Sequence, residues 1–465
     1  MKKFNESKKH LATQWGEFAE QTTYNDLPRK VQDYAKTLIL DLLGCIIGGR
    51  HIESSQIASK VAMTLGGNPQ STVIGYNTKV SAPWAAFING VTGHAFDMDD
   101  DHREGTLHSS VAVFPAVLAM AETLGATGKD VITAYVLGSE LMIRLGESFL
   151  GQTYYQGFHP TGTTGVFGAT LGAGKILGLN AAQLATAQGI AGSEAAGLLE
   201  WKADGSWTKR FQAGYAAMNG ILPALLARDG YTGPSSIYEG KDGFVRAYSY
   251  QDKFDVFRIN NRLGEKWEFA DNSIKPHACC RFACPIVDCA IDISKNNELN
   301  PSDIEDVIVK CNKWMITILT EPSGRKYHPE TVVDAQFSLP YAAAVGLVKK
   351  RASVPEFTNA SIKDPEILTL MQKVRYELDP EAEKVYPEKY PSTVIVTMKD
   401  GKKYSSYIEH PKGDPENPIN REELLAKFRL LSSFNMQAKR AENIIDLVSN
   451  LEQIKNINEL TDLLR

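Results

Sequence analysis

The stretch GHAFDMDDDHREGTLHSSVAVFPAVLAMAETLGA, residues 93–126, joins a densely charged segment to a strongly apolar one. Its charged part holds four aspartates and three of the nine histidines of the chain. An isolated charge run is usually a solvated surface loop. The flanking sequences, residues 82–96 and 111–126, are too apolar to lie on the surface. We therefore expect a loop that is anchored by two buried helices and opens into a cleft, with Ser109 or Ser110 capping the second helix.

Length and composition favour a protein of two domains that acts on a small molecule. The chain has 465 residues, of which 43% are hydrophobic and 23% charged, and a formal net charge of −5. No long run of one charge sign suggests a nucleic-acid or membrane surface. Residues 1–18 lack the apolar core of a signal peptide, and no segment has the ~18 to 20 apolar residues that cross a bilayer. We expect a cytoplasmic protein.

From about residue 6 to residue 270 the sequence has the periodicity of helices. Pro28 and the pair Gly48 and Gly49 mark the start and the end of the first long one. Alanine and glycine are frequent in these segments, and small residues let helix backbones approach closely, so we expect a dense bundle. The segments expected to be helical are residues 27–49, 82–96, 111–126, 130–149, 165–178, 180–198 and 213–230.

A change of pattern after residue 271 predicts a smaller α+β domain. Residues 304–310 form a β-branched run, and residues 391–410 alternate around Asp400 and Gly401 as a hairpin does. Helices are expected at residues 334–348, 361–374, 421–433 and 437–451. The fold class is therefore mainly α: a large all-helical domain with an inserted smaller α+β lid domain and a cleft between the two. The expected boundaries are residues 1–271 and 413–465 for the helical domain and 272–412 for the lid.

Two metal-site hypotheses receive little support from the spacing of their residues. Cys279, Cys280, Cys284 and Cys289 do not follow the spacing of zinc or iron–sulfur sites, so buried packing is favoured. The aspartates of residues 97–101 resemble a magnesium motif, but no second acidic cluster accompanies them. We expect neither a metal nor another cofactor.

Several basic residues stand where buried helices are expected to begin or where the lid joins. His159 precedes a glycine-rich helix that lacks the GxxxxGK[ST] phosphate-loop pattern, so its helix N-terminus could instead join an anion site. Cations placed at the ends of buried helices favour a pocket for a molecule with two or three carboxylates. The other cations of this kind are Lys209, Arg210, Lys275, His277 and Arg281.

Several distinctive motifs stand in one order over nearly the whole chain. They are LILDLLGCIIGG, GHAFDMDDDH, FPAVLAMAE, HPTGTTGVFGA, TKRFQAGYAAMNG, ALLARDGYTGP, IKPHACCRF, DAQFSLPYAAA and PKGDPENP. Together they resemble the MmgE/PrpD family, which includes 2-methylcitrate dehydratases, cis-aconitate decarboxylases and an iminodisuccinate epimerase. The resemblance implies a homodimer with a helical domain and an α+β lid that needs no metal.

The resemblance also implies a set of site residues. The residues that the decarboxylase branch is thought to use fall on Asp97, Asp101, His108, His159 and Lys209, with Lys275 opposite. Asp101 stands where that branch has a threonine, Ser109 where it has a proline, and Cys284 where family members often have a histidine. These departures affect the choice of substrate.

Substrates of this kind require a proton to move at a carbon beside a carboxylate. We expect Lys209, Lys275 and His159 to hold the carboxylates and His108, oriented by Asp97, to move the proton. His102 is the candidate acid for a dehydration, and Asp101, His277 and Arg281 are further candidate substrate-binding residues.

Three functions remain open from the sequence. The leading hypothesis is a metal-independent lyase, a decarboxylase or dehydratase, of a small di- or tricarboxylic acid such as cis-aconitate or 2-methylcitrate. The alternative is an epimerase or isomerase of a related acid such as iminodisuccinate. The third is a helical binding protein without catalysis.

Overall fold

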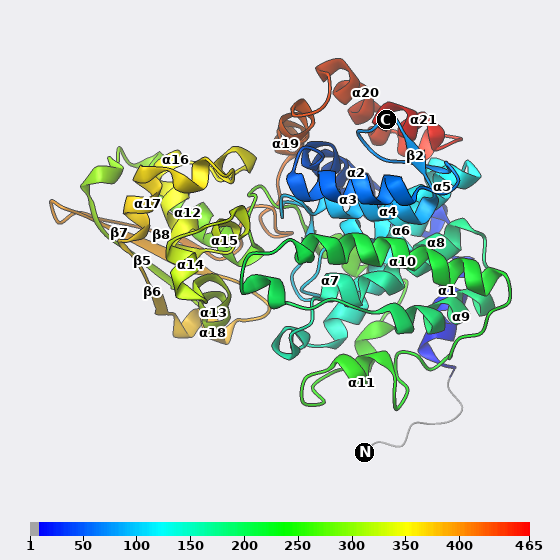
Figure 1. The fold of residues 1–465 in the computed structure, drawn as a ribbon. Helices are drawn as coiled ribbons and strands as arrows, with labels where there is room; N and C mark the ends of the chain where they lie inside the picture. Colours follow the sequence, from blue (N-terminus) through cyan, green and yellow to red (C-terminus); the bar gives the residue numbers. More distant parts are fainter. Residues whose placement is uncertain (1–8) are drawn as a thin grey trace.

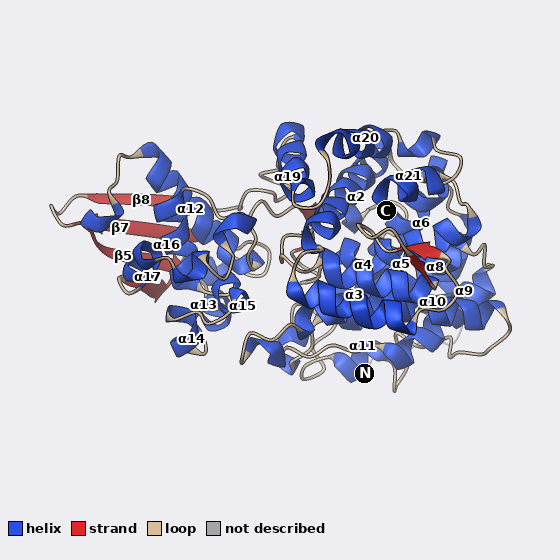
Figure 2. Ribbon diagram, turned by 45° about the horizontal axis from the view of Figure 1, so that its top comes forward, coloured by secondary structure: helices blue, strands red, loops and turns tan. Residues whose placement is uncertain are grey.

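The computed structural model describes residues 9–465 as two lobes, a large helical one and a smaller one that carries the main sheet (Figures 1 and 2). The fold class is therefore mainly α, as predicted from the sequence. No helix among the described residues is both long and apolar enough to cross a membrane. The segment whose composition argued against a signal peptide lies in part outside the described residues.

The large lobe packs long helices around one apolar core. The carboxyl-terminal helices return to this lobe after the smaller one is complete, and α19 and α20 contact α2 (Figure 1). The helices are α1 (Leu11–Gln21), α2 (Arg29–Gly49), α3 (Glu53–Leu65), α4 (Ala82–Gly93), α5 (Ser109–Leu124), α6 (Gly128–Ser148), α7 (Pro160–Thr163), α8 (Gly165–Ile176), α9 (Ala181–Ala191), α10 (Thr208–Arg228), α11 (Phe244–Tyr248), α19 (Arg421–Ser433), α20 (Ala438–Ser449) and α21 (Asn458–Leu464). Short strands β1 (Ser71–Thr72), β2 (Lys79–Val80), β3 (Asp101–His102) and β4 (Asn272–Ser273) complete it.

Glycines bring the central helices of this lobe into backbone contact. A Cβ atom at Gly168 of α8 would lie 2.6 Å from the carbonyl oxygen of Gly138 in α6, and one at Gly138 would lie 2.5 Å from the carbonyl oxygen of Gly168. A Cβ atom at Gly90 of α4 would lie 2.8 Å from the Cα of Gly214 in α10. These distances are too short for any side chain, so the small residues set the helix spacing, as the composition predicted.

The smaller lobe contains a four-stranded sheet in the order β6-β5-β7-β8. β5 pairs with β6 in parallel and with β7 antiparallel, and β7 forms the predicted hairpin with β8 around Gly401. The helices α12 and α16 pack together, and α12 contacts β7 and β8. The elements are α12 (Cys284–Asn296), β5 (Ile304–Cys311), α13 (Lys313–Thr320), α14 (Ser323–Tyr327), α15 (Val332–Gln336), α16 (Leu339–Lys349), α17 (Pro365–Met371), β6 (Val374–Leu378), α18 (Pro380–Lys384), β7 (Ser392–Met398) and β8 (Lys403–Ile408).

Three predicted helices differ from the structure. The segment 361–374 contains only the short helix α17, and its last residue begins the parallel strand β6, which was not predicted. The helix expected at 334–348 is broken before α16, where the Ser338 hydroxyl accepts a hydrogen bond from the backbone amide of Tyr341 and caps a new helix. The helix expected at 180–198 ends at Ala191.

Two apolar cores divide the described chain. The first core draws on side chains between Leu11 and Ile274 and again between Leu424 and Leu464. The second core lies mainly between Ala278 and Met398, but it also contains a few side chains of the helical part, such as Phe96 and Leu431. On this basis we propose domain boundaries after residues 271 and 412.

The glycine contact between α6 and α8 gives a test of this packing. We expect Gly168→Ala to lower the free energy of unfolding of the helical lobe by about 1–3 kcal/mol, because the added methyl group must push two backbones apart. Thermal unfolding followed by circular dichroism measures the loss. Gly324→Ala is the control, since a Cβ atom there meets nothing within 4 Å. Equal melting temperatures for the two variants would contradict the close packing.

Candidate active site

The charged loop between α4 and α5 is held in place by buried neighbours on every side. Both helices are buried over most of their length, as expected from the sequence. Within the loop, β3 pairs antiparallel with β4, so that Asp101 lies opposite Ser273 and His102 opposite Asn272. This pairing brings the segment that leads to Lys275 against the loop, although the two are about 170 residues apart in sequence.

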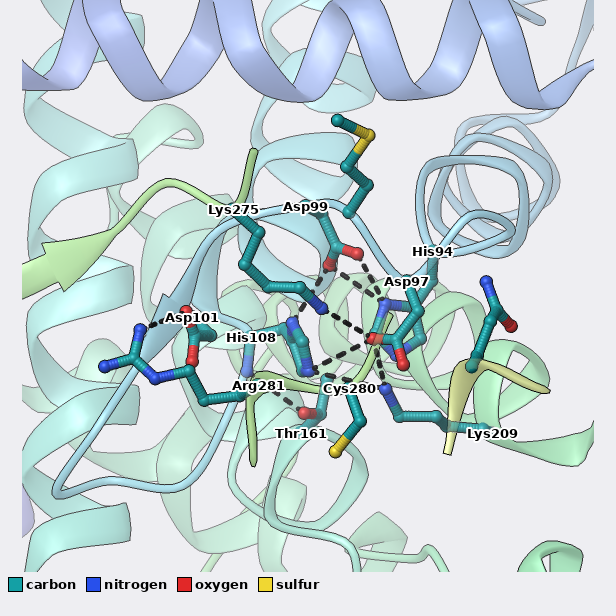
Figure 3. A network of polar contacts seen from close by, with 12 residues as sticks. His94, Asp97, Asp99, Asp101, His108, Thr161, Lys209, Lys275, Cys280 and Arg281 are labelled. Carbon is teal, nitrogen blue, oxygen red and sulfur yellow. Dashed lines mark hydrogen bonds and ion pairs between the residues drawn. The ribbon is translucent and has the colours of Figure 1, made fainter. Parts of the chain in front are cut away.

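Asp97 lies between two buried ammonium groups (Figure 3). Its Oδ1 accepts hydrogen bonds from Lys209 Nζ at 2.7 Å and from Lys275 Nζ at 2.9 Å. Burial alone would raise the pKa of Asp97, but the two lysines outweigh it and hold the pKa well below its ordinary value. The backbone of Asp97 has a φ of +52°, a left-handed conformation that aspartate tolerates better than most residues.

His108 presents one ring nitrogen to these charges. Its Nδ1 donates to the backbone carbonyl oxygen of Asp100 at 2.9 Å and lies 3.4 Å from Asp99 Oδ2. Because a carbonyl oxygen only accepts, the proton of the neutral ring is on Nδ1, and Nε2 is left as the free base. Nε2 lies 3.4 Å from Lys209 Nζ and 3.8 Å from Asp97 Oδ1. The backbone of Asp100 and the carboxylate of Asp99 therefore orient His108, and the expectation that Asp97 does so is corrected.

A second layer of histidines lies behind His108. His94 Nδ1 lies 2.9 Å from both oxygens of Asp99, and its ring contacts that of His108 edge to face, with centroids 4.6 Å apart. His159 stacks on His94 at a centroid distance of 6.2 Å, and its Nδ1 donates to Gln212 Oε1 at 2.7 Å. Burial lowers the pKa of His94 to about 3 and also lowers that of His159. Both rings are neutral at physiological pH.

A group of arginines and acids lies beside β3, at the other end of the loop. Arg281 Nη2 donates to Asp414 Oδ2 at 2.7 Å, and its Nη1 donates to Asp101 Oδ1 at 3.3 Å. Arg103 Nη1 lies 3.3 Å from the same Asp414 oxygen, and its Nη2 donates to Glu416 at 2.8 Å. Each guanidinium group therefore already has a carboxylate partner.

A small cavity that is partly open to solvent lies between the loop and the smaller lobe. Of the nine residues predicted from the sequence, six line it: Asp97, Asp101, His102, His108, Lys209 and Arg281. Lys275 and His159 are not part of the lining, but the first contacts Asp97 and the second lies behind His94. The other lining residues are Arg103, Thr106, Leu107, Tyr154, Cys280, Phe282, Phe337 and Tyr390.

Two predicted residues do not present a nitrogen to the reacting centre. His102 Nδ1 accepts a hydrogen bond from the backbone amide of Gly105, and its Nε2 lies 3.9 Å from Glu147. His277 Nε2 lies 2.8 Å from Asp288, outside the cavity lining. Both nitrogens of His102, the candidate acid, therefore lie beside protein groups, and His277 pairs with Asp288 of α12.

Sequence reasoning missed several neighbours of the site. His94 and Asp99 stand in the charged stretch itself, but their spacing gave no reason to prefer them. Asp100 caps α5: its Oδ2 accepts from the Ser109 hydroxyl at 3.0 Å and from the Ser110 amide at 3.4 Å. Ser109 or Ser110 was expected to cap the helix, but neither does. His108 is the N-cap residue, and its side chain points to the site.

Four side chains of the site could ligate a metal ion, but two ammonium groups beside them disfavour a cation. The ligand atoms of His94, Asp97, Asp99 and His108 lie within 4.8 Å of one another. Two ammonium groups are already hydrogen-bonded to Asp97, and a divalent cation would have to lie beside both of them. The geometry therefore favours an anion as the ligand of this site.

All six cysteines lie in the described part of the chain, and each is buried and free of disulfides. The cluster at residues 279–289 contributes apolar side chains to the second core. Cys280 also lines the cavity. Buried packing was the function predicted for this cluster.

Comparison with known proteins gives matches to the two domain models of one family and to several relatives along most of the chain. The model of the MmgE/PrpD N-terminal domain matches residues 13–256, and that of the MmgE/PrpD C-terminal domain matches residues 277–453. A cis-aconitate decarboxylase of Aspergillus terreus is 29% identical over 96% of this chain and 94% of its own length. The human cis-aconitate decarboxylase is 28% identical over 94% of this chain and 91% of its own length.

The buried carboxyl group of Asp100 gives a pH-dependent prediction. Burial, with the neighbouring charge of Asp99, raises the pKa of Asp100 from 3.8 to about 8. Between these values the folded protein binds more protons than the unfolded chain, so this group's contribution to the free energy of unfolding falls as pH rises, by up to about 1.4 kcal/mol per pH unit. We expect Asp100→Asn to remove this pH dependence of the free energy of unfolding. Urea unfolding at a series of pH values measures it.

The control for this measurement is Asp229→Asn. Asp229 is exposed and its pKa is lowered by the adjacent Arg228, so its titration is complete at acidic pH. Asp229→Asn should therefore show the same pH dependence of the free energy of unfolding as the unaltered protein. An unaltered slope in Asp100→Asn as well would show that Asp100 is ionised in the folded state.

Proposed function

The chain belongs to the MmgE/PrpD family, and we propose on that basis that it is a metal-independent lyase acting on a small di- or tricarboxylic acid. The observation that carries the proposal is the grouping of Asp97, Lys209 and His108 in one cavity wall, with Lys275 bonded to Asp97 behind them. Two ammonium groups flank one carboxylate, and that of Lys209 also borders the cavity, where it can meet a substrate carboxylate. A free imidazole nitrogen lies directly beside it.

This arrangement suits proton transfer at a carbon next to a carboxylate. In a decarboxylation, the bond to one carboxylate breaks, carbon dioxide leaves, and the electron pair remains on the carbon. The remaining carboxylate takes up part of that charge and is stabilised by Lys209 and Lys275. For this step the His108 ring must first take up a proton from solvent on Nε2. It then gives that proton to the carbon and returns to the neutral form, while Nδ1 stays hydrogen-bonded to the carbonyl of Asp100.

Two observations favour decarboxylation over the other reactions of the family. A dehydratase needs an acid for the departing hydroxyl group, and both nitrogens of His102 face away from the reacting centre. An epimerase of an acid such as iminodisuccinate needs proton carriers on opposite faces of the substrate, but His108 Nε2 and Lys209 Nζ lie only 3.4 Å apart. The names of the relatives agree with this choice. We take cis-aconitate and 2-methylcitrate as the first substrates to test.

We further propose a homodimer that works in the cytoplasm. The helices α3, α4 and α10 lie side by side in the helical lobe (Figure 2), and both α3 and α10 expose large apolar side chains. Val61 on α3 is 52% exposed and Phe211 on α10 is 47% exposed. Exposed apolar patches of this kind mark protein interfaces. Six reduced cysteines fit a reducing compartment.

The catalytic proposal predicts the effect of two substitutions. His108→Ala and Lys209→Ala should each lower turnover at least about a hundredfold, because one removes the proton carrier and the other removes charge stabilisation. Proton NMR in deuterated water, with cis-aconitate, 2-methylcitrate, citrate and iminodisuccinate, measures turnover and identifies the product. His328→Ala, an exposed histidine of the smaller lobe, is the control.

The same NMR measurement separates the three functions. Loss of carbon dioxide or water indicates a lyase, and deuterium uptake without net change indicates an epimerase. Full activity in His108→Ala would contradict the assigned proton carrier. No change in any of the four acids would favour a binding protein.

The dimer proposal is tested at its apolar face. Val61→Asp and Phe211→Asp should each convert the protein to a monomer, because a charge buried at the interface without a partner is strongly unfavourable. Light scattering coupled to gel filtration measures the mass. Tyr407→Asp, a similarly exposed side chain of the smaller lobe, is the control. A dimer that persists in both α3 and α10 variants would place the interface elsewhere.

A further inference from the structure

The two ends of the cavity differ in their balance of charge. At the inner end, the positive charges of Lys209 and Lys275 are matched by the carboxylate of Asp97, which both contact, and by the neighbouring carboxylate of Asp99, so the charges balance. At the outer end, the positive charges of Arg281 and Arg103 are matched by three carboxylates, those of Asp101, Asp414 and Glu416. The outer end therefore has no excess positive charge.

The partners of Arg281 are fixed by the fold. Asp414 is buried, accepts from Arg281, and also accepts from the hydroxyl of Ser273 at 3.0 Å. Ser273 is the residue opposite Asp101 in the β3–β4 pair. Tyr390 lies against the guanidinium group, with its ring centroid 5.6 Å away. Arg281 therefore cannot turn to a substrate carboxylate without leaving the buried Asp101 unpaired, which is costly.

Asp101 itself forms part of the cavity wall. Its side chain retains only 6% exposure, so its charge is poorly screened by water. A substrate carboxylate at this end would meet a like charge. A hydroxyl or amino group would instead find an acceptor for its hydrogen bond.

We propose that Asp101 determines the specificity of the site, by excluding a carboxylate from the outer end of the cavity and accepting a hydrogen bond there from a hydroxyl or amino group of the substrate. This inference rests on the proposed function and narrows it. The preferred substrate carries its carboxylates at the lysine end and a hydrogen-bond donor at the arginine end. Among small acids, those with a hydroxyl or amino group should bind better than those with a further carboxylate in its place.

Three small acids probe this preference by binding alone. Butanedioate carries two carboxylates, 2-hydroxybutanedioate adds a hydroxyl group, and propane-1,2,3-tricarboxylate adds a third carboxylate. Isothermal titration gives their dissociation constants for the full-length protein. We expect the hydroxy acid to bind more tightly than butanedioate, and the tricarboxylate no more tightly than butanedioate.

Asp101→Asn removes the charge and keeps the shape. It should strengthen binding of the tricarboxylate relative to butanedioate by at least about tenfold, because the like charge is gone. Asp101→Ser is a second variant with the same expected direction, and melting curves establish that each variant is folded. Glu416→Gln removes a charge beside Arg103 on the exposed side, outside the cavity lining, and should leave the order of affinities unchanged.

The outcomes separate this proposal from the proposed function. If the acids bind but the ratio of tricarboxylate to butanedioate is the same in the unaltered protein and in both Asp101 variants, Asp101 does not determine specificity. If Glu416→Gln shifts the ratio as much as Asp101→Asn, the effect is a general one of net charge, and the proposal is also overturned. If none of the three acids binds to any of the proteins, both the proposed function and this inference are wrong.

Discussion

The structure depends on one buried carboxylate that is shared by two lysines. Asp97 comes from the loop after α4, Lys209 from the first turn of α10, and Lys275 from the segment after β4. A buried ion pair of this kind is favourable only when its geometry is fixed by the surrounding chain, because removing one partner leaves a charge without compensation. Three distant segments must therefore be positioned together before the site exists.

The glycine contacts of the helical lobe provide that positioning. α4 and α10 approach at Gly90 and Gly214 so closely that no side chain fits between them. The loop that carries Asp97 leaves the carboxyl end of α4, and Lys209 lies at the amino end of α10, so the spacing of these two helices sets the distance between the charges. The close packing of small residues therefore also fixes the geometry of the site.

Most helices of this arrangement could be predicted from the sequence, but the contacts between distant strands and side chains could not. The helices were predictable because apolar periodicity and caps are local, and α19 begins and ends at the residues expected. β6 was missed because a short parallel strand gets its stability from β5, a distant partner. Among the site residues, the charged stretch pointed to the loop that lines the cavity. The sequence could not show that Asp99 rather than Asp97 lies beside Nδ1 of His108, because that depends on the left-handed turn at Asp97.

The alternation of side chains along this loop explains how the two lobes share one site. Phe96 and Met98 belong to the apolar core of the smaller lobe, while Asp97 lines the cavity and Asp99 contacts the histidines behind it. The backbone is held from both sides: Gln336 of α15 donates to the carbonyl of Phe96 at 2.8 Å, and Lys427 of α19 donates to that of Met98 at 2.6 Å. Lys427 also pairs with the buried Asp41 of α2. A displacement of the smaller lobe must therefore either break the bond from Gln336 or move Asp97, which makes the position of this lobe a part of the geometry of the candidate site.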